Sequence, residues 1–258
     1  MNPSEARAAT ILTILPSPPG ADAYLAVDKQ PGIAVHGPGG LLGALREHLG
    51  AEGADLALVH RLDKETSGVL LLARNAEALR AAHAAWPTHV EKTYLGVTRG
   101  VPDPPEGRVD APLLEHRTSR PDLLKRAVKA AYGPSRAGHL LSGRRVLAIQ
   151  PLPPPGRTAV HPAGRPAATR YRVIEDRGAT ALVELVPETG RMHQLRIHLL
   201  HLGTPLLGDP AYDAEHKPGD PPPRLHAARL VWTDPPGMPP GTTWTWEAPR
   251  PAPALPEP

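Results

Sequence analysis

A short polar segment between two apolar runs carries the residue types best suited to chemistry in this chain. Residues 60–68 read HRLDKETSG and lie between LALV at 56–59 and VLLLA at 69–73. Both apolar runs have the length of buried strands, so the polar segment is predicted to be a loop on a rigid scaffold, where catalytic groups tend to occur. Within this segment, Asp63 is the carboxylate that has apolar residues close by. It is expected either to do chemistry or to accept bonds from the Thr66 and Ser67 amides in an Asx-type turn.

The flanking sequence predicts the elements that must hold this loop. Helical spacing predicts a helix over 41–49 that ends at Gly50, and an Ala-rich helix over 76–86 that ends at Pro87. A third helix is expected from His193 to a stop at Gly203. Alternating or apolar runs predict strands at 11–15, 23–27, 69–73, 94–99, 168–174 and 181–187.

Composition narrows the classes of function. The chain of 258 residues has no Cys, which excludes disulfides, thiolate nucleophiles and Cys-bound metals. Its net charge of +3 permits a polyanionic partner without demanding one. No run reaches the length of a membrane span, so a cytoplasmic protein without a membrane partner is expected. Residues 1–10 are expected to be flexible and residues 251–258 to form a disordered tail.

The polar segment resembles the His-Arg-Leu-Asp-x-x-Thr-Ser-Gly signature of the RluA family of pseudouridine synthases. Other segments are similar to the same family in chain order: DKQPGIAVHG at 28–37, EKTYLGVTRG at 91–100, TGRMHQLRIH at 189–198 and RLHAARL at 224–230. The resemblance implies an α+β pseudouridine synthase fold, with a central, largely antiparallel mixed sheet, flanking helices and a cleft over Asp63. It implies one catalytic domain over 11–250.

The family resemblance also implies a reaction and roles for particular residues. Such enzymes isomerise uridine in RNA without cofactor or metal, with Asp63 as nucleophile and Arg196 as the cation that favours its ionised form. Tyr94 would stack on the base and move a proton; the alternative is a strand Tyr bonded locally. Arg61 would hold the flipped nucleotide. Further substrate contacts are expected from His60, Arg191, His193, Gln194 and Leu225. The resemblance leaves open whether Asp63 attacks the sugar or the base. It also leaves open whether the substrate is ribosomal RNA or transfer RNA.

Residues 117–160 are predicted to be a basic insertion between family segments. The insertion holds nine Arg and Lys residues against the single acid Asp122. A helix is expected over 121–132 and a stiff linker over 151–156. Such a run is either a solvated face or a set of phosphate contacts. The candidates for RNA backbone contacts are Lys125, Arg126, Lys129, Arg144 and Arg145.

Two other classes of function compete with this interpretation. A metal hydrolase would use His193, His198 and His201, but no carboxylate partner or general base accompanies them in the segment. A catalytically inactive RNA-binding protein of the same fold is the second alternative. Turnover on RNA that contains uridine separates the second alternative from the enzyme. A monomer with RNA as its partner is expected.

Overall fold

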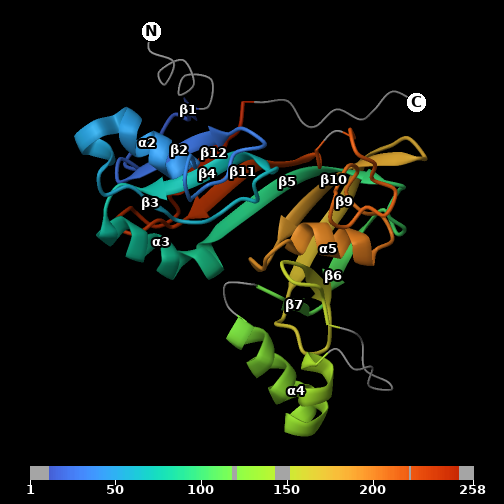
Figure 1. Cartoon of the computed structure of the whole chain (residues 1–258). Helices are drawn as coiled ribbons and strands as arrows, with labels where there is room; N and C mark the ends of the chain where they lie inside the picture. Colours follow the sequence, from blue (N-terminus) through green and yellow to red (C-terminus); the bar gives the residue numbers. More distant parts are fainter. Residues whose placement is uncertain (1–11, 118–120, 143–151, 221, 250–258) are drawn as a thin grey trace. The chain divides into compact units, whose positions relative to one another are not determined.

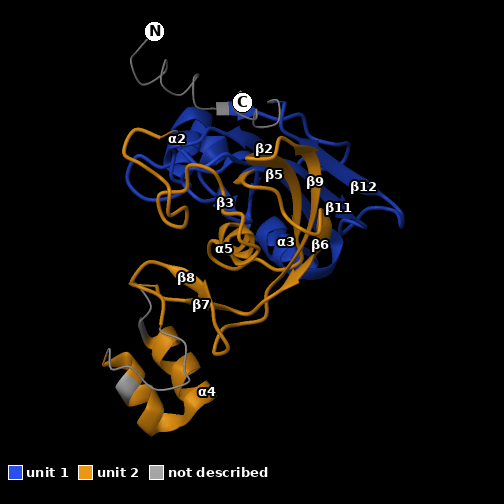
Figure 2. Ribbon diagram, turned by 90° about the vertical axis from the view of Figure 1, so that its right-hand side faces the viewer, with its two compact units in different colours: residues 1–97, 221–258 blue, residues 98–220 orange. Residues whose placement is uncertain are grey.

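The computed structural model describes residues 12–117, 121–142, 152–220 and 222–249. The chain divides into two compact units, residues 1–97 with 221–258 and residues 98–220 (Figure 2). No helix of the described residues is long and apolar enough to cross a membrane. The expectations for 1–10 and 251–258 fall outside the described residues, and the single domain over 11–250 stays a prediction.

The first unit is built on a mixed, largely antiparallel sheet, which confirms the predicted fold class. Its strands follow the order β1 (Leu12–Ile14), β2 (Tyr24–Lys29), β4 (Ser67–Ala73), β11 (Leu225–Thr233) and β5 (Val90–Arg99). β3 (Ala57–Leu58) also pairs with β4, and β12 (Thr243–Glu247) with β11. Only the β4–β11 pair is parallel among these described pairings.

Helices cover both faces of the centre of this sheet (Figure 1). Successive side chains of a strand point to opposite faces, and residues 69–73 of β4 are all buried, so each face needs a cover. α3 (Ala76–His89) packs Ala78 and Ala82 into a cluster with Trp232 of β11. α2 (Leu41–Leu49), followed by a 3-10 turn over Gly50–Gly53, lies on the other side and buries Leu41 and Leu45.

The second unit has an antiparallel sheet in which β9 (Ala168–Asp176) lies between β10 (Thr180–Pro187) and β6 (Glu106–Asp110). β7 (Leu113–Glu115) and β8 (Thr158–Val160) form a separate pair. α5 (Gln194–His201) lies against β8 and β10. It begins after His193, which adopts a left-handed conformation.

The insertion contains α4 (Pro121–Leu141), which is longer than the predicted helix. Gly133 has non-helical angles (φ 75°, ψ 167°), and Pro134 follows it at a position where a helix tolerates its missing N–H. The element is therefore two helical pieces joined at Gly133. Both pieces pack on Leu114 of β7, through Leu124 and Val128 from the first and Ala137 and Leu140 from the second.

Several predicted elements differ from the structure. α3 was expected to end at Pro87 but continues to His89. A proline in the last turn removes only one helical bond, the one to the carbonyl of the exposed His83, so the helix can continue past it. β3 is half-buried rather than buried. The predicted linker over 151–156 is described from residue 152 and stays a prediction; at its end the Gly156 N–H donates to the His116 carbonyl at 2.7 Å. The short strands β6, β7 and β8 were not predicted.

Candidate active site

The loop that carries Asp63 is anchored by a buried ammonium group from β2. Lys29 is fully buried, and its Nζ donates to the carbonyl oxygens of Gln30 (2.9 Å), Ile33 (2.8 Å) and Lys64 (2.8 Å). An ammonium has three donors, and these three charge-assisted bonds offset the cost of burying its charge. Lys29 therefore holds the residue directly after Asp63.

Two histidines tie the two ends of this loop to the sheet. At its start, Nε2 of His60 accepts the Leu71 N–H of β4 at 3.0 Å. At its end, Ser67 Oγ and Nδ1 of His226 share a hydrogen bond of 2.9 Å. Within the loop, the Thr66 N–H donates to the main-chain carbonyl of Asp63 at 3.1 Å, so the turn closes through the backbone. The predicted Asx-type bonds from the Thr66 and Ser67 amides to the Asp63 carboxylate stay a prediction.

Gly68 lets β4, the strand that follows the loop, lie close beside β11. Its φ is +104°, and a Cβ there would lie 2.1 Å from the Ala227 carbonyl oxygen. Only glycine allows β4 to approach β11 this closely. Ala227 pairs with Gly68 on one side and with Tyr94 of β5 on the other. The register thus places Tyr94 of β5 level with Gly68 of β4, with β11 between the two strands.

Tyr94 is buried within the electric field of Asp63. Only 8% of its surface is exposed. Burial, followed by the negative charge of Asp63, raises the pKa of the Tyr94 phenol well above its usual value of 10.0. The phenol therefore keeps its proton at neutral pH. Its two predicted roles, stacking on the base and moving a proton, both stay predictions.

His60 is neutral for structural reasons. Burial and the nearby charge of Lys92 lower the pKa of the imidazole from 6.5 to about 3, although a bond to the Arg61 backbone opposes the shift. Burial also lowers the pKa of Lys92 to about 8, and its Nζ lies 5.4 Å from the Trp86 ring centroid. The His60 and Trp86 rings are 4.9 Å apart. His60 thus serves the scaffold, and its predicted substrate contact stays a prediction.

In the second unit, Arg196 is held by a buried carboxylate that sequence reasoning assigned no role. Nε and Nη2 of Arg196 donate to the two oxygens of Asp209, each at 2.7 Å. The Asp209 side chain is fully buried and that of Arg196 is 12% exposed. The guanidinium carbon lies 4.9 Å from the ring centroid of Tyr212. Asp209 and Tyr212 therefore fix one edge and one face of Arg196. The predicted pairing of Arg196 with Asp63 joins the two units and stays a prediction.

Gln194 and His198 hold α5 against β9. Gln194 Oε1 accepts from Thr189 Oγ1 (2.7 Å) and from the Arg191 N–H (3.0 Å), and its Nε2 donates to the Ala168 carbonyl (2.9 Å). His198 bonds Thr169 Oγ1 at 2.8 Å. A substrate contact by Gln194 would require one of these bonds to open. The motif around Gln194 therefore works first as an internal scaffold.

The remaining predicted residues occupy varied surroundings. Arg61 is exposed, as a contact to a flipped nucleotide requires, whereas Leu225 is 6% exposed and belongs to the core. His193 Nδ1 shares a bond of 2.7 Å with Tyr212 Oη, which also accepts the Thr158 N–H. The described residues contain no group of three or more His, Cys, Asp or Glu that could hold a metal ion.

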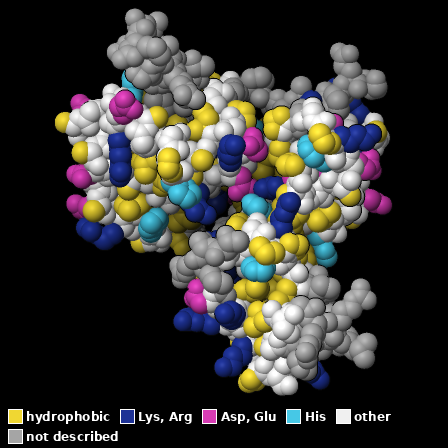
Figure 3. Space-filling view, viewed as in Figure 1, with side chains coloured by type: hydrophobic (Ala, Val, Ile, Leu, Met, Phe, Trp, Pro, Cys, Tyr) yellow, Lys and Arg dark blue, Asp and Glu magenta, His cyan; other side chains and the backbone are white. Residues whose placement is uncertain are grey.

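The exposed basic residues of α4 lie beside its packed face. Lys125, Arg126 and Lys129 are all exposed, and Figure 3 shows Lys and Arg side chains along one flank of this element. Arg144 and Arg145 lie outside the described residues. Asp63, Tyr94, His60, Arg61 and Leu225 belong to the first unit; Arg191, His193, Gln194, Arg196 and the basic candidates belong to the second.

Comparison with known proteins identifies the class. The solved structure of human RNA pseudouridylate synthase domain containing 4 aligns with a TM-score of 0.65 and 25% identity over 96% of this chain and 92% of that one. The fold of this chain, a mixed sheet with an anchored Asp63 loop, is therefore the pseudouridine synthase fold. A family model described as RNA pseudouridylate synthase matches residues 23–201. The chain belongs to this family, and the resemblance to its RluA members is confirmed.

Curated relatives agree with this assignment. A mitochondrial pseudouridylate synthase of Xenopus tropicalis is 37% identical over 210 residues, which are 75% of this chain and 60% of the relative. Ribosomal large subunit pseudouridine synthase D of Nitrosomonas europaea is 32% identical over 246 residues, 89% of this chain and 60% of the relative. The chain spans about half to three fifths of the length of the first three curated relatives that it matches.

Proposed function

We propose that this protein isomerises uridine to pseudouridine in RNA, with Asp63 as nucleophile. The observation that carries the proposal is the family match over residues 23–201, which includes the pinned Asp63 loop. The N1–C1′ bond breaks, the uracil turns, and C5 bonds to C1′. C5 then loses its hydrogen to solvent while N1 gains one, so atoms balance without an external reactant.

Each named side chain has a task in this scheme. Asp63 attacks the sugar or the base and later leaves, which a carboxylate is suited to do. Tyr94, neutral and buried, supports the turning base by stacking. Arg196, fixed by Asp209, supplies a positive charge of defined direction that favours ionised carboxylate at the site. Arg61 is exposed and would hold the nucleotide once it has left its stack.

Ribosomal RNA is the favoured substrate, because relatives of this chain are named ribosomal large subunit pseudouridine synthases C and D. Transfer RNA is the alternative outcome. Lys125, Arg126 and Lys129 would contact the RNA backbone from α4. The monomeric state and the cytoplasmic location stay predictions.

The test is release of tritium from RNA labelled at C5 of uridine, since C5 loses its hydrogen only if the glycosidic bond is remade. Wild-type protein should release tritium, and Asp63→Asn, which removes the charge but nearly keeps the shape, should bind the same RNA without release. Binding without release by the wild type would favour the inactive RNA-binding alternative. Release by Asp63→Asn at the wild-type rate would exclude Asp63 as nucleophile. Mapping the uridines that lose modification on gene deletion then identifies the RNA.

A further inference from the structure

Three arginines of the second unit gather around one carboxylate at the end of β7. Arg117 Nε donates to Glu115 Oε2 and Arg165 Nη2 donates to Oε1, each at 2.5 Å. The Met192 N–H also reaches Oε1 at 3.4 Å, and this bond brings the preceding residue, Arg191, to the same place. We call Glu115, Arg117, Arg165 and Arg191 the Glu115 cluster.

The main chain fixes the arginines of this cluster. Arg165 exchanges two backbone hydrogen bonds of 2.9 Å with Leu113, two residues before Glu115. A Cβ on Gly164 would lie 2.5 Å from the Leu113 carbonyl carbon, so the loop that carries Arg165 is pressed against β7. On the other side, Arg191 Nε donates to the Pro166 carbonyl at 3.1 Å. With the Glu115 bonds of Arg117 and Arg165, these contacts hold the three guanidinium groups in place before any ligand binds.

The Glu115 cluster carries more positive than negative charge. The Glu115 side chain is only 7% exposed; burial opposes its ionisation, but bonds and charge from Arg117 and Arg165 outweigh burial and lower its pKa. Arg191 forms no ion pair within the part of the chain that the structure describes. Burial and the positive charge of Arg165 lower its pKa, and Glu115 only partly opposes them. Three guanidinium groups thus share one carboxylate, an excess of two positive charges.

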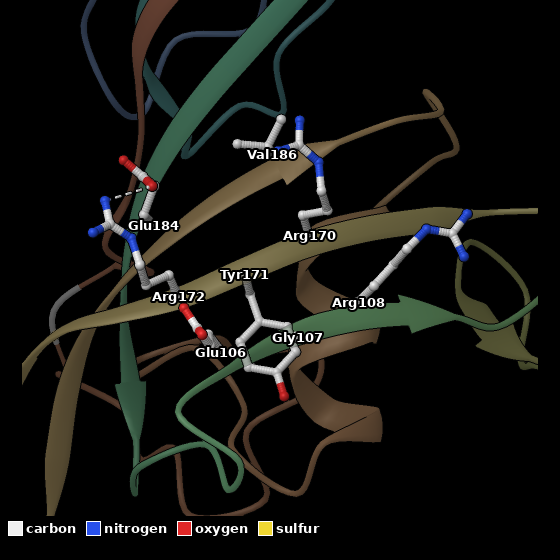
Figure 4. Close-up of a pocket in the computed structure, with 8 residues that line it drawn as sticks. All are labelled: Glu106, Gly107, Arg108, Arg170, Tyr171, Arg172, Glu184 and Val186. Atoms are coloured by element: carbon white, nitrogen blue, oxygen red, sulfur yellow. Dashed lines mark hydrogen bonds and ion pairs between the residues drawn. The ribbon is translucent and has the colours of Figure 1, made fainter.

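Another group of arginines in the same unit shows the opposite balance. Arg108, Arg170 and Arg172 line a hollow of about 500 Å³ on a solvent-exposed face of β6, β9 and β10 (Figure 4). Each pairs with a carboxylate there, as in the Arg172–Glu184 contact of 3.1 Å drawn in Figure 4. The acids on this face are Glu106, Asp110, Glu184 and Glu188. Arginines are therefore balanced by acids on that face but not in the Glu115 cluster.

We propose that the Glu115 cluster is a phosphodiester-binding site that takes a backbone phosphate of the RNA. The proposal rests on the proposed function, which supplies RNA as the ligand. A guanidinium fork matches two phosphate oxygens, and Arg165 is 56% exposed and able to reach one. The two oxygens of Glu115 hold the guanidinium groups of Arg117 and Arg165 in separate positions. A bound phosphate would offset the excess positive charge of the cluster. A contact of this kind positions RNA without reading its bases.

The test compares the salt dependence of RNA binding in charge-changing and charge-keeping variants of the full chain. The probe is a single-stranded RNA of about 20 nucleotides that contains uridine, titrated at several salt concentrations. Arg165→Gln with Arg191→Gln should weaken binding and lower the log–log salt slope by about 0.7 for each lost contact. Arg165→Lys with Arg191→Lys keeps the charge and should keep most of the slope. The matched control, Arg108→Gln with Arg172→Gln, makes the same change of charge and should leave the slope unchanged.

The outcomes separate this inference from the proposed function. If the wild type releases no tritium from C5-labelled RNA, the proposed function fails. If it does release tritium but the double Gln variant keeps the wild-type slope, only the phosphate site is refuted. An equal loss of slope in the Lys variant or in the control pair would also refute it. Should the double Gln variant melt early, Arg191→Gln alone gives the same comparison, because it removes only one main-chain bond.

Discussion

Replacing Arg196 by Met is the sharpest test of how the second unit holds its proposed catalytic cation. In the native protein two bonds of 2.7 Å join the guanidinium to Asp209, whose side chain is fully buried. The variant leaves the Asp209 carboxylate without its guanidinium partner. Breaking a buried pair in this way lowers the free energy of unfolding by about 3–5 kcal/mol. At an m value of about 2 kcal/mol per M, the urea midpoint should fall by about 2 M.

Two matched variants show whether burial of the pair causes this loss. Arg172→Met removes an arginine whose side chain is 60% exposed and whose partner is Glu184, so it should cost less than about 1 kcal/mol. Adding Asp209→Asn to Arg196→Met removes the stranded charge and should restore much of the midpoint. If Arg196→Met destabilises the protein no more than Arg172→Met does, the pair does not behave as buried and the reasoning is refuted. Loss of tritium release without any loss of stability would mean that Arg196 acts in chemistry alone.

Three further changes test the scaffold and the insertion. Wild-type stability should decline as pH falls from about 6.5 to about 3, because His60 is protonated in the unfolded chain but stays neutral in the folded protein. His60→Gln should flatten this part of the plot of urea midpoint against pH. Parallel plots for the two proteins would contradict the assignment. Gly68→Ala should cost well over about 1 kcal/mol in thermal unfolding, whereas Gly138→Ala, with nothing within 4 Å, should be neutral or stabilising; equal effects would contradict the close approach. Changing Lys125, Arg126 and Lys129 to Ala should weaken binding to all RNAs, flatten the salt slope and leave the chosen uridine unchanged; an unchanged slope would make α4 a solvated face.

Local sequence patterns predict much of this fold because many elements are encoded by their own residues. The apolar run at 69–73 predicts β4, and the leucines that follow His193 at helical spacing predict α5. The parallel pairing of β4 with β11 was not predictable in this way, because Ser67 and its partner His226 are far apart in the chain. Alternation within a strand carries no information about which distant strand lies beside it.

The candidate site shows the same division between local and distant information. The resemblance directs attention to Asp63, Tyr94 and Arg196, but it says nothing of Glu115, which lies at the edge of an unfamiliar insertion. His60 was expected to contact substrate, since a polar residue beside a candidate nucleophile has no visible structural task in sequence. Its task depends on the Leu71 N–H, whose position only the folded strand determines. Polar residues that satisfy distant backbone groups are therefore the ones that sequence reasoning misses.

The buried ammonium of Lys29 has a kinetic consequence. Mobile ions screen charges at the surface far more than charges removed from water, so added salt leaves the three carbonyl bonds of Lys29 intact while it weakens contacts to RNA phosphates. The geometry around Asp63 and the capture of RNA therefore respond differently to ionic strength. For a pseudouridine synthase built this way, rising salt should increase KM and leave kcat nearly constant. A buried cation bonded to backbone carbonyls thus holds the Asp63 loop in a way that does not depend on the ionic strength that governs the proposed RNA contacts.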